Sequence, residues 1–484
     1  MPDLTIQTLE RANIAFAFVS ALARVFVRIL RRSDRQDPAR SSKAIVQRNQ
    51  MKAASVFTIC LLLCASGASQ AETPPSQSDA PYDANPRHLW NRLNETLFVR
   101  AAPDGERYGS AELDILFWGN TQHLITSPTH EKAIQVLDQF IRGHGERLIR
   151  DPLKRALLQR DLWALFDWSA DYRTHPAANA SEAQARTGLQ RRLATVIKRL
   201  ALTPDEIGRL PDNHVEAEKL LLASGFPLGL FAPDGAWQLV GRPDGTTARE
   251  HGSAFGGRSV FLVFVKFPAG REQAVRYLKE LREFVPGLVY TDGDFPTTQK
   301  QEGQFLRVNP ATPQFPAGTQ WALVRRLCLI DDRGEIRATR LIESIQTRTY
   351  LSIPEADSDF NALRNAQSVA EFQMDLANFP SLRAVAEGER DFHFVHFRSM
   401  GVDPFERLSA ADWVRDRNPV RSETLRTCKK CHFARGVLSV NTYASFGRDA
   451  SRLQESTLER EANEMLTWKA SQFDWGLLKG LWRE

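Results

Sequence analysis

The chain has 484 residues, 42% of them hydrophobic and 25% charged, which is typical of soluble globular proteins and long enough for two or three domains. The net charge of +5 comes from residues 1–71, which hold ten Lys/Arg and four Asp/Glu and leave 53 Lys/Arg against 54 Asp/Glu in residues 72–484. Because this main part is nearly neutral, we expect no nucleic-acid partner and no attraction to an anionic membrane surface.

The N-terminal region contains the three parts of a secretory signal peptide at residues 51–71. Met51-Lys52 is followed by an apolar run at 53–65 and by small residues up to Ala71, after which cleavage is expected. The apolar run is too short to be a good membrane span. We therefore expect an exported protein that is periplasmic or secreted.

Residues 1–50 precede this signal, and the sequence allows two interpretations of them. The first expectation is that Met51 is the true start and that residues 1–50 are a non-native upstream extension. The alternative is a membrane-proximal helix at 14–30, where an apolar run contains Arg24 and Arg28. Attachment to a membrane is expected only if residues 14–30 are retained.

A helical domain is predicted at 87–225, after a leader at 72–86 that we expect to be disordered because Pro, Ser and Asp dominate it. Asp151-Pro152 has the form of an N-cap followed by proline at the first helical position. Thr203 and Glu206 have the spacing of a capping box. Apolar residues at helical spacing predict helices at 128–148, 153–168, 181–202 and 213–223.

An α+β domain is predicted at 226–380, where the period of the apolar residues changes. Residues 259–267 form a continuous β-branched and aromatic run, which indicates a strand buried on at least one face. An amphipathic helix is expected at 271–285. Further strands are expected at 321–330, 335–340, 341–351 and 370–376, with a helix as the alternative for the last. The predicted fold class is therefore α+β, with a mostly antiparallel sheet and helices on one face.

The remaining residues, 381–484, form a C-terminal segment. Aromatic residues and histidines alternate at 391–397, which favours a strand. A loop follows, and then a long helix is expected at 451–471, with Leu458, Ala462 and Met465 on its inward face. The aromatic and apolar tail at 473–482 predicts a helix that docks on the rest of the protein.

A short motif in this segment, Cys428-Lys429-Lys430-Cys431-His432, has a specific chemistry. Two thiols about one helical turn apart can each add to a vinyl group of a porphyrin, and the next histidine can then bind the iron. Cys60 and Cys64 would leave with the signal peptide, so the mature chain keeps only Cys328 outside the motif. Cys328 lies in an apolar run and is expected to be a buried, inert thiol.

The motif resembles the haem-attachment site of the cytochrome c superfamily over five residues. This resemblance implies haem c bound covalently through Cys428 and Cys431, with His432 as an axial iron ligand. Pieces at 151–156, 159–164, 255–262 and 431–436 are similar to an uncharacterised family of secreted bacterial proteins. That second similarity extends over about 87–446 and implies export and a shared architecture, but no known activity.

The second axial position of such a haem has several candidates. Met465 is one, and its thioether would raise the reduction potential. His393 and His396 are others, but they are three residues apart and so lie on opposite faces of a strand, which means that at most one can serve. Met400 is a weaker candidate, and an open sixth position would allow small-ligand chemistry. Only 52 residues follow the motif, so residues before it must help to build a haem pocket.

Two kinds of function remain open from the sequence. The first is an exported monohaem c-type protein in electron transfer or haem-based redox chemistry, with a redox partner that the sequence does not identify. The alternative is a secreted binding or scaffold protein in which Cys428–Cys431 is a structural or redox disulfide. A zinc site at these residues would need a further ligand from elsewhere. The sequence contains no recognisable catalytic motif, so it leaves enzyme activity undecided.

Overall fold

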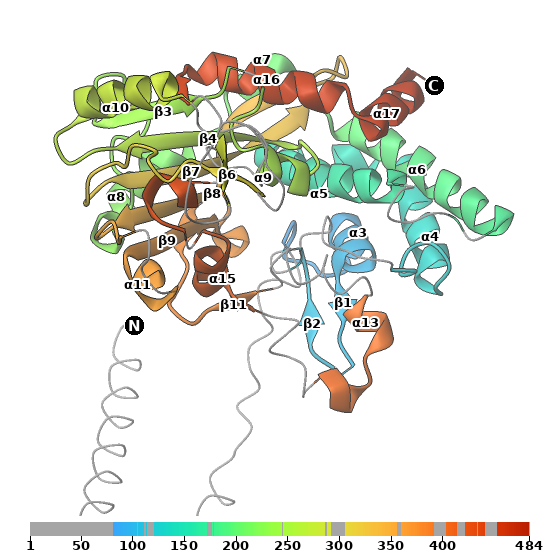
Figure 1. The fold of residues 1–484 in the computed structure, drawn as a ribbon. Coiled ribbons are helices and arrows are strands. Elements are labelled where there is room, and N and C mark those ends of the chain that lie inside the picture. The colour runs from blue at the N-terminus through green and yellow to red at the C-terminus, as the bar shows by residue number, and fades with distance from the viewer. Residues whose placement is uncertain are drawn as a thin grey trace, which may run out of the picture. The chain divides into compact units, whose positions relative to one another are not determined.

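A computed structural model gives the fold of the chain (Figure 1). The described residues are 81–103, 105–110, 113, 121–171, 177, 179–243, 245–285, 288–291, 305–355, 360–391, 403–413, 422–432, 434–440 and 453–483. They all belong to one compact unit, Pro75–Glu484. Within them, no helix combines the length and the apolar character needed to cross a membrane. The predicted signal peptide, the alternative helix at 14–30 and most of the predicted strand at 391–397 lie outside the described residues.

The first part of this unit is mainly helical, as predicted. Its helices are α3 (Leu89–Phe98), α4 (Thr129–Arg142), η3 (Gly145–Arg147), α5 (Pro152–Ala170), α6 (Ala180–Leu200), α7 (Pro204–Gly208), α8 (Asn213–Leu220) and η4 (Leu222–Ser224). The Asp151 side chain caps α5 by accepting from the backbone N–H of Leu153, and Thr203 and Glu206 form the predicted capping box. A short hairpin, β1 (Arg100–Ala101) and β2 (Arg107–Tyr108), was not predicted.

A seven-stranded antiparallel sheet forms the second part, which confirms the mixed α+β class with a mostly antiparallel sheet. The strand order is β10-β9-β8-β7-β4-β3-β13. Of the strand expected at 370–376, residues 370–374 lie in strand β9 and Leu376 begins η5. The two strands expected at 335–351 are one continuous strand, β8. The strands are β3 (Trp237–Gly241), β4 (Ser259–Lys266), β7 (Gln320–Ile330), β8 (Ile336–Tyr350), β9 (Gln367–Met374), β10 (Leu382–Ala384) and β13 (Gln454–Glu455).

Shorter elements complete the described structure. Two further pairs of strands are β5 (Leu288–Thr291) with β6 (Phe305–Val308), and β11 (Arg390–Asp391) with β12 (Ser422–Glu423). The remaining helices are α9 (Arg249–Ala254), α10 (Arg271–Glu283), α11 (Phe360–Asn365), η5 (Leu376–Asn378), α13 (Pro404–Arg407), α15 (Thr424–Cys431), η6 (Gly436–Ser439), α16 (Leu458–Ala470) and α17 (Phe473–Arg483).

The helix predicted at 451–471 begins later than expected. Strand β13 occupies Gln454–Glu455, and Thr457 caps α16 by accepting from the backbone N–H of Arg460. Leu458 is 38% exposed rather than inward, whereas Glu461, Met465 and Lys469 are buried. The predicted inward face was therefore right for Met465 and wrong for Leu458. The other two buried positions are charged, so an apolar stripe could not reveal them.

The two faces of the central sheet differ in chemistry. Leu262, Val324, Ile345 and Phe372 are aligned across β4, β7, β8 and β9 on one face, and each is fully buried. The next row, on the opposite face, is Val263, Leu323, Gln346 and Glu371. A buried sheet face normally stays apolar, so polar residues on β8 and β9 indicate a special role for this opposite face. We call it the site face.

One hydrophobic core runs through the unit from Tyr82 to Trp482. The C-terminal helix α17 packs against α5 and α6, and the Trp475 ring lies 5.9 Å from that of Trp163. This confirms the docking helix expected at 473–482. Helices α4, α5 and α6 lie beside the sheet, and α16 runs along it to join α17 (Figure 1). The domain boundaries predicted at 225 and 380 therefore fall inside a shared core.

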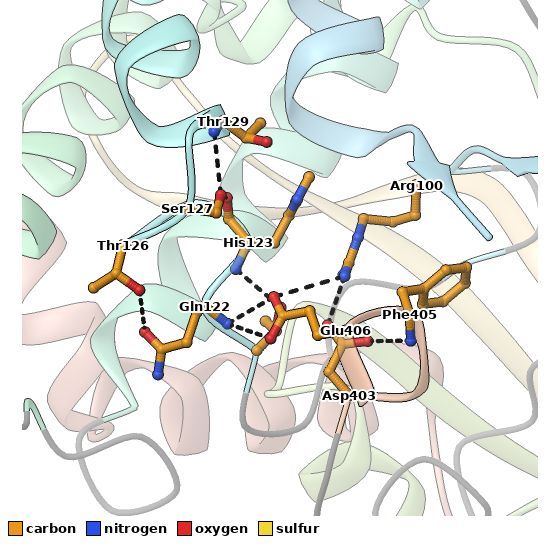
Figure 2. A network of polar contacts seen from close by, with 10 residues as sticks. Arg100, Gln122, His123, Thr126, Ser127, Thr129, Asp403, Phe405 and Glu406 are labelled. Carbon is orange, nitrogen blue, oxygen red and sulfur yellow. Dashed lines mark hydrogen bonds and ion pairs between the residues drawn. The ribbon is translucent and has the colours of Figure 1, made fainter. Parts of the chain in front are cut away.

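A buried polar network joins the first hairpin to residues more than three hundred positions later in the chain (Figure 2). The Arg100 guanidinium and the Asp403 carboxylate are 2.6 Å apart, and both side chains are at most 3% exposed. Asp403 also caps α13 by accepting from the backbone N–H of Phe405. The Glu406 carboxylate accepts hydrogen bonds from the Thr121 hydroxyl at 2.7 Å and from the Gln122 N–H at 2.9 Å.

Replacing Glu406 with alanine is expected to lower the free energy of unfolding by about 1–3 kcal/mol, because the nearly buried Thr121 hydroxyl loses its acceptor. Denaturant titration of the purified variant measures this change. Glu216→Ala is the control, because Glu216 forms an exposed ion pair with Lys219 and should change stability by less than about 0.5 kcal/mol. An equal effect of the two substitutions would contradict a specific role for Glu406.

Candidate functional site

The C-x-x-C-H motif ends helix α15, which packs against β9 on the site face. The helix begins after Glu423, and its Thr427 hydroxyl donates to the Glu423 carbonyl at 2.9 Å. Cys428 therefore faces the sheet and is only 5% exposed, and His432 is the residue at which the helix ends. The side chain of Cys431 lies outside the described part of the structure. The motif is thus fixed on the half of the sheet where the site face becomes polar.

Three side chains of the sheet hold Cys428. Gln346 Nε2 lies 3.0 Å from Cys428 Sγ, and Glu371 Oε2 lies 3.6 Å from the same sulfur. Arg348 donates to the Cys428 carbonyl oxygen at 2.9 Å. Burial raises the pKa of the Glu371 carboxyl, although hydrogen bonds from Gln373, Gln346 and Cys428 oppose this shift. The polar residues of the site face are therefore the residues that orient the first cysteine of the motif.

A hydrogen bond to the backbone fixes the orientation of the His432 ring. Its Nδ1 lies 2.8 Å from the carbonyl oxygen of Ser439, and a carbonyl can only accept, so this nitrogen carries the proton. Nε2 then has the free electron pair that coordination requires. Ser439 itself is fixed, because its hydroxyl pairs with the Tyr350 hydroxyl at 2.5 Å and donates to the Gly436 carbonyl.

Both His432 and its neighbour His251 are neutral near pH 7. Burial, and next the positive charge of Arg348, hold the pKa of His432 well below its ordinary value. Burial also lowers the pKa of His251 to about 4, with Arg348 and Arg325 adding to the effect. Because a metal binds the neutral form of imidazole, neither residue has to lose a proton before coordination at neutral pH.

His251 comes from helix α9 and was not singled out in the sequence. Its ring centre lies 6.4 Å from that of His432, and the two ring planes differ by only 19°. It also lies 5.8 Å from the Phe261 ring of β4. No short-range pattern links His251 to the motif, since they are far apart in the chain and only the folded sheet brings them together.

A cavity separates α9 from the motif on the site face. It comprises about 680 Å³ of space between atoms, part of it open to solvent. Val263, Leu323 and Trp321 line it from the sheet, and His251 and His432 line it from two sides. Three arginines, Arg242, Arg249 and Arg348, also line this cavity. It therefore combines an apolar sheet surface with positive charge and two neutral imidazoles.

The other predicted candidates for the second ligand are placed differently. Met465 is 1% exposed and is not among the residues that line the cavity. Met465 instead packs against α9, so closely that a Cβ added to Gly252 of that helix would lie 2.7 Å from Met465 Cε. His393 and His396 lie outside the described residues, as does Met400. In the part of the chain that the structure describes, no group of three or more His, Cys, Asp and Glu residues could hold a metal ion.

Cys328 is the buried thiol that the sequence predicted. It is fully buried in β7, and burial together with the charge of Glu343 raises its pKa to about 12. Such a thiol is unreactive at neutral pH, so Cys328 does not belong to the site.

No family model, no curated protein and no solved structure matches the chain. A functional proposal must therefore be based on the geometry and chemistry of the site itself.

Proposed function

We propose that this protein is an exported monohaem c-type protein that acts in electron transfer or haem-based redox chemistry. The observation that supports this most is the state of His432. It follows C-x-x-C, faces a cavity, and has its Nδ1–H bound to the Ser439 carbonyl, so that Nε2 is available to a metal. A histidine that served only a structural disulfide would need none of these features.

Several residues at the cavity suit a haem group: His432 lines it, and so does Gln346, which contacts the sulfur of the neighbouring Cys428. Cys428 and Cys431 would form the two thioether bonds, and His432 would bind the iron, which supplies one-electron redox chemistry. The Ser439 carbonyl keeps the imidazole in one tautomer and makes it a better donor. Arg242, Arg249 and Arg348 line the cavity and could balance the carboxylates of the porphyrin. Val263, Leu323 and Trp321 would give the group an apolar surface on the side of the sheet.

The resemblance to secreted bacterial proteins with this motif belongs to the same proposal. Covalent haem attachment of this type takes place after export, so a signal peptide at 51–71 and a C-x-x-C-H motif are consistent with each other. We propose a periplasmic or secreted location and a redox protein as partner. No catalytic role is assigned to any residue.

The test is to express the chain from Met51 in a host that exports it and matures c-type cytochromes. We expect intact mass to increase by one haem and the Soret absorption to remain with the protein after extraction with acidic acetone. The double variant Cys428→Ala/Cys431→Ala should be exported but colourless after extraction. A wild-type protein without haem, and with the mass of a Cys428–Cys431 disulfide, would refute this proposal and favour the secreted binding or scaffold protein.

A further inference from the structure

The rings of His251 and His432 lie close together at the cavity. The two rings come from different parts of the fold, one from α9 and one from the end of α15. They line the same cavity, and their planes are within 19° of parallel. Their centres are 6.4 Å apart, near the upper end of the roughly 4.5–7 Å range of paired aromatic rings.

This distance is close to the one expected for two imidazoles on opposite sides of a single metal ion. A coordinating imidazole nitrogen lies about 2 Å from the metal and about 1.1 Å from its own ring centre, so two such rings have centres roughly 6.2 Å apart. The observed 6.4 Å differs from this by less than the length of a bond.

The position of His251 is fixed by contacts with α16. The Thr247 hydroxyl, one turn before His251, hydrogen-bonds to the Glu461 carboxylate. Gly252 leaves room for Met465, and Gly257, at a φ of +70°, leaves room for Trp468. A side chain at either glycine would force the neighbouring side chains of α16 to move. Three successive turns of α16 thus contact α9 and the residues on either side of it, with His251 at the cavity.

We propose that His251 is the second axial ligand of the haem, which makes the site a bis-histidine centre. This inference rests on the function proposed above, and it selects His251 over Met465, His393 and His396. Both axial positions are then filled, so the site transfers electrons and does not bind small gaseous ligands. Two imidazoles also give a lower reduction potential than the His–Met pair that Met465 would provide.

The first experiment uses the wild-type protein with its haem attached. Its electron paramagnetic resonance and near-infrared magnetic circular dichroism spectra should be those of low-spin bis-histidine iron, and reduced protein should not bind carbon monoxide. Spectra of His–Met ligation, or immediate binding of carbon monoxide, would overturn the proposal.

Variants then identify the ligand. His251→Ala should keep one covalently attached haem by intact mass, become high-spin, bind carbon monoxide after reduction, and return to low spin when imidazole is added. His251→Met should raise the reduction potential. Met465→Leu is the matched control and should retain the wild-type spectrum. A His251→Ala protein with an unchanged low-spin spectrum would overturn the proposal. If His393→Ala or His396→Ala instead changes the haem from low spin to high spin, the histidine replaced in that variant is the ligand.

Different results would refute the c-type function and the role of His251. Absence of a haem adduct in the wild-type mass would refute the c-type function and, with it, the role of His251. A haem adduct with an axial ligand other than His251 would refute only the inference made here.

Discussion

Between pH 6.5 and about pH 3 the protein is expected to lose roughly 3–5 kcal/mol of stability through a single side chain, His123. His123 lies in the buried network that contains Arg100 (Figure 2). Burial, and next the charge of Arg100, lower its pKa to about 3. As the pH falls through this range, the unfolded chain binds a proton at His123 that the folded protein does not. Unfolding therefore becomes progressively more favourable.

The measurement is a series of denaturant titrations at several pH values, with wild type, His123→Gln and His144→Gln compared. The His123→Gln variant should lose less stability on acidification than wild type, by roughly 3–5 kcal/mol. His144 is a suitable control because its side chain is 53% exposed. If all three proteins lose stability in parallel, His123 is not the group responsible.

Replacing Lys469 with methionine is expected to be among the most destabilising substitutions, at about 3–5 kcal/mol. Lys469 is fully buried on α16, 2.7 Å from the Asp167 carboxylate of α5, and it also pairs with Asp474 of α17. Burial, and next the charge of Asp474, raise the pKa of Asp167 well above its usual range. Without the lysine, two neighbouring carboxylates would remain in the core, with Arg258 as a cation 3.3 Å from Asp167.

Thermal and denaturant unfolding of Lys469→Met would show this loss directly. The triple variant Lys469→Met/Asp167→Asn/Asp474→Asn should recover part of it, because the two carboxylates that lost the lysine are then neutral. The recovery should be incomplete, since Arg258 loses the charge of Asp167. Lys219→Met removes a lysine from an exposed pair and should change stability by less than about 0.5 kcal/mol. A loss of the same small size for Lys469→Met would show that the buried pairs contribute little.

Local patterns predicted those parts of the fold that depend on neighbouring residues. The capping box at Thr203, the N-cap at Asp151 and the buried run of β4 each follow from a few consecutive residues. The inward face of α16 was only partly predicted because it contains Glu461 and Lys469, whose burial depends on partners elsewhere in the chain. Charged residues in a core are stabilised by long-range contacts, which a period in the sequence does not reveal.

In the candidate site, too, only the residues that belong to a local pattern could be predicted from the sequence. Cys428 and His432 were selected because the motif is local and chemically specific. His251 was missed because its relation to the motif exists only across the sheet, through strands β4, β7 and β8. The roles of Gln346 and Glu371 were also invisible, since polar residues in strands are ordinarily read as solvent-facing.

The last elements of the chain set the order in which the protein can fold. Strand β13 completes the edge of the sheet beside β3, and α17 covers α5 and α6, which lie some three hundred residues earlier. These pairings are distant in sequence, so closing them is expected to be slow. Until residues 454–483 are in place, the sheet edge beside β3 and the face of α5 that α17 covers stay uncovered. An exported chain would therefore expose C-K-K-C-H for some time before it folds, which gives a maturation enzyme an interval in which to reach both thiols.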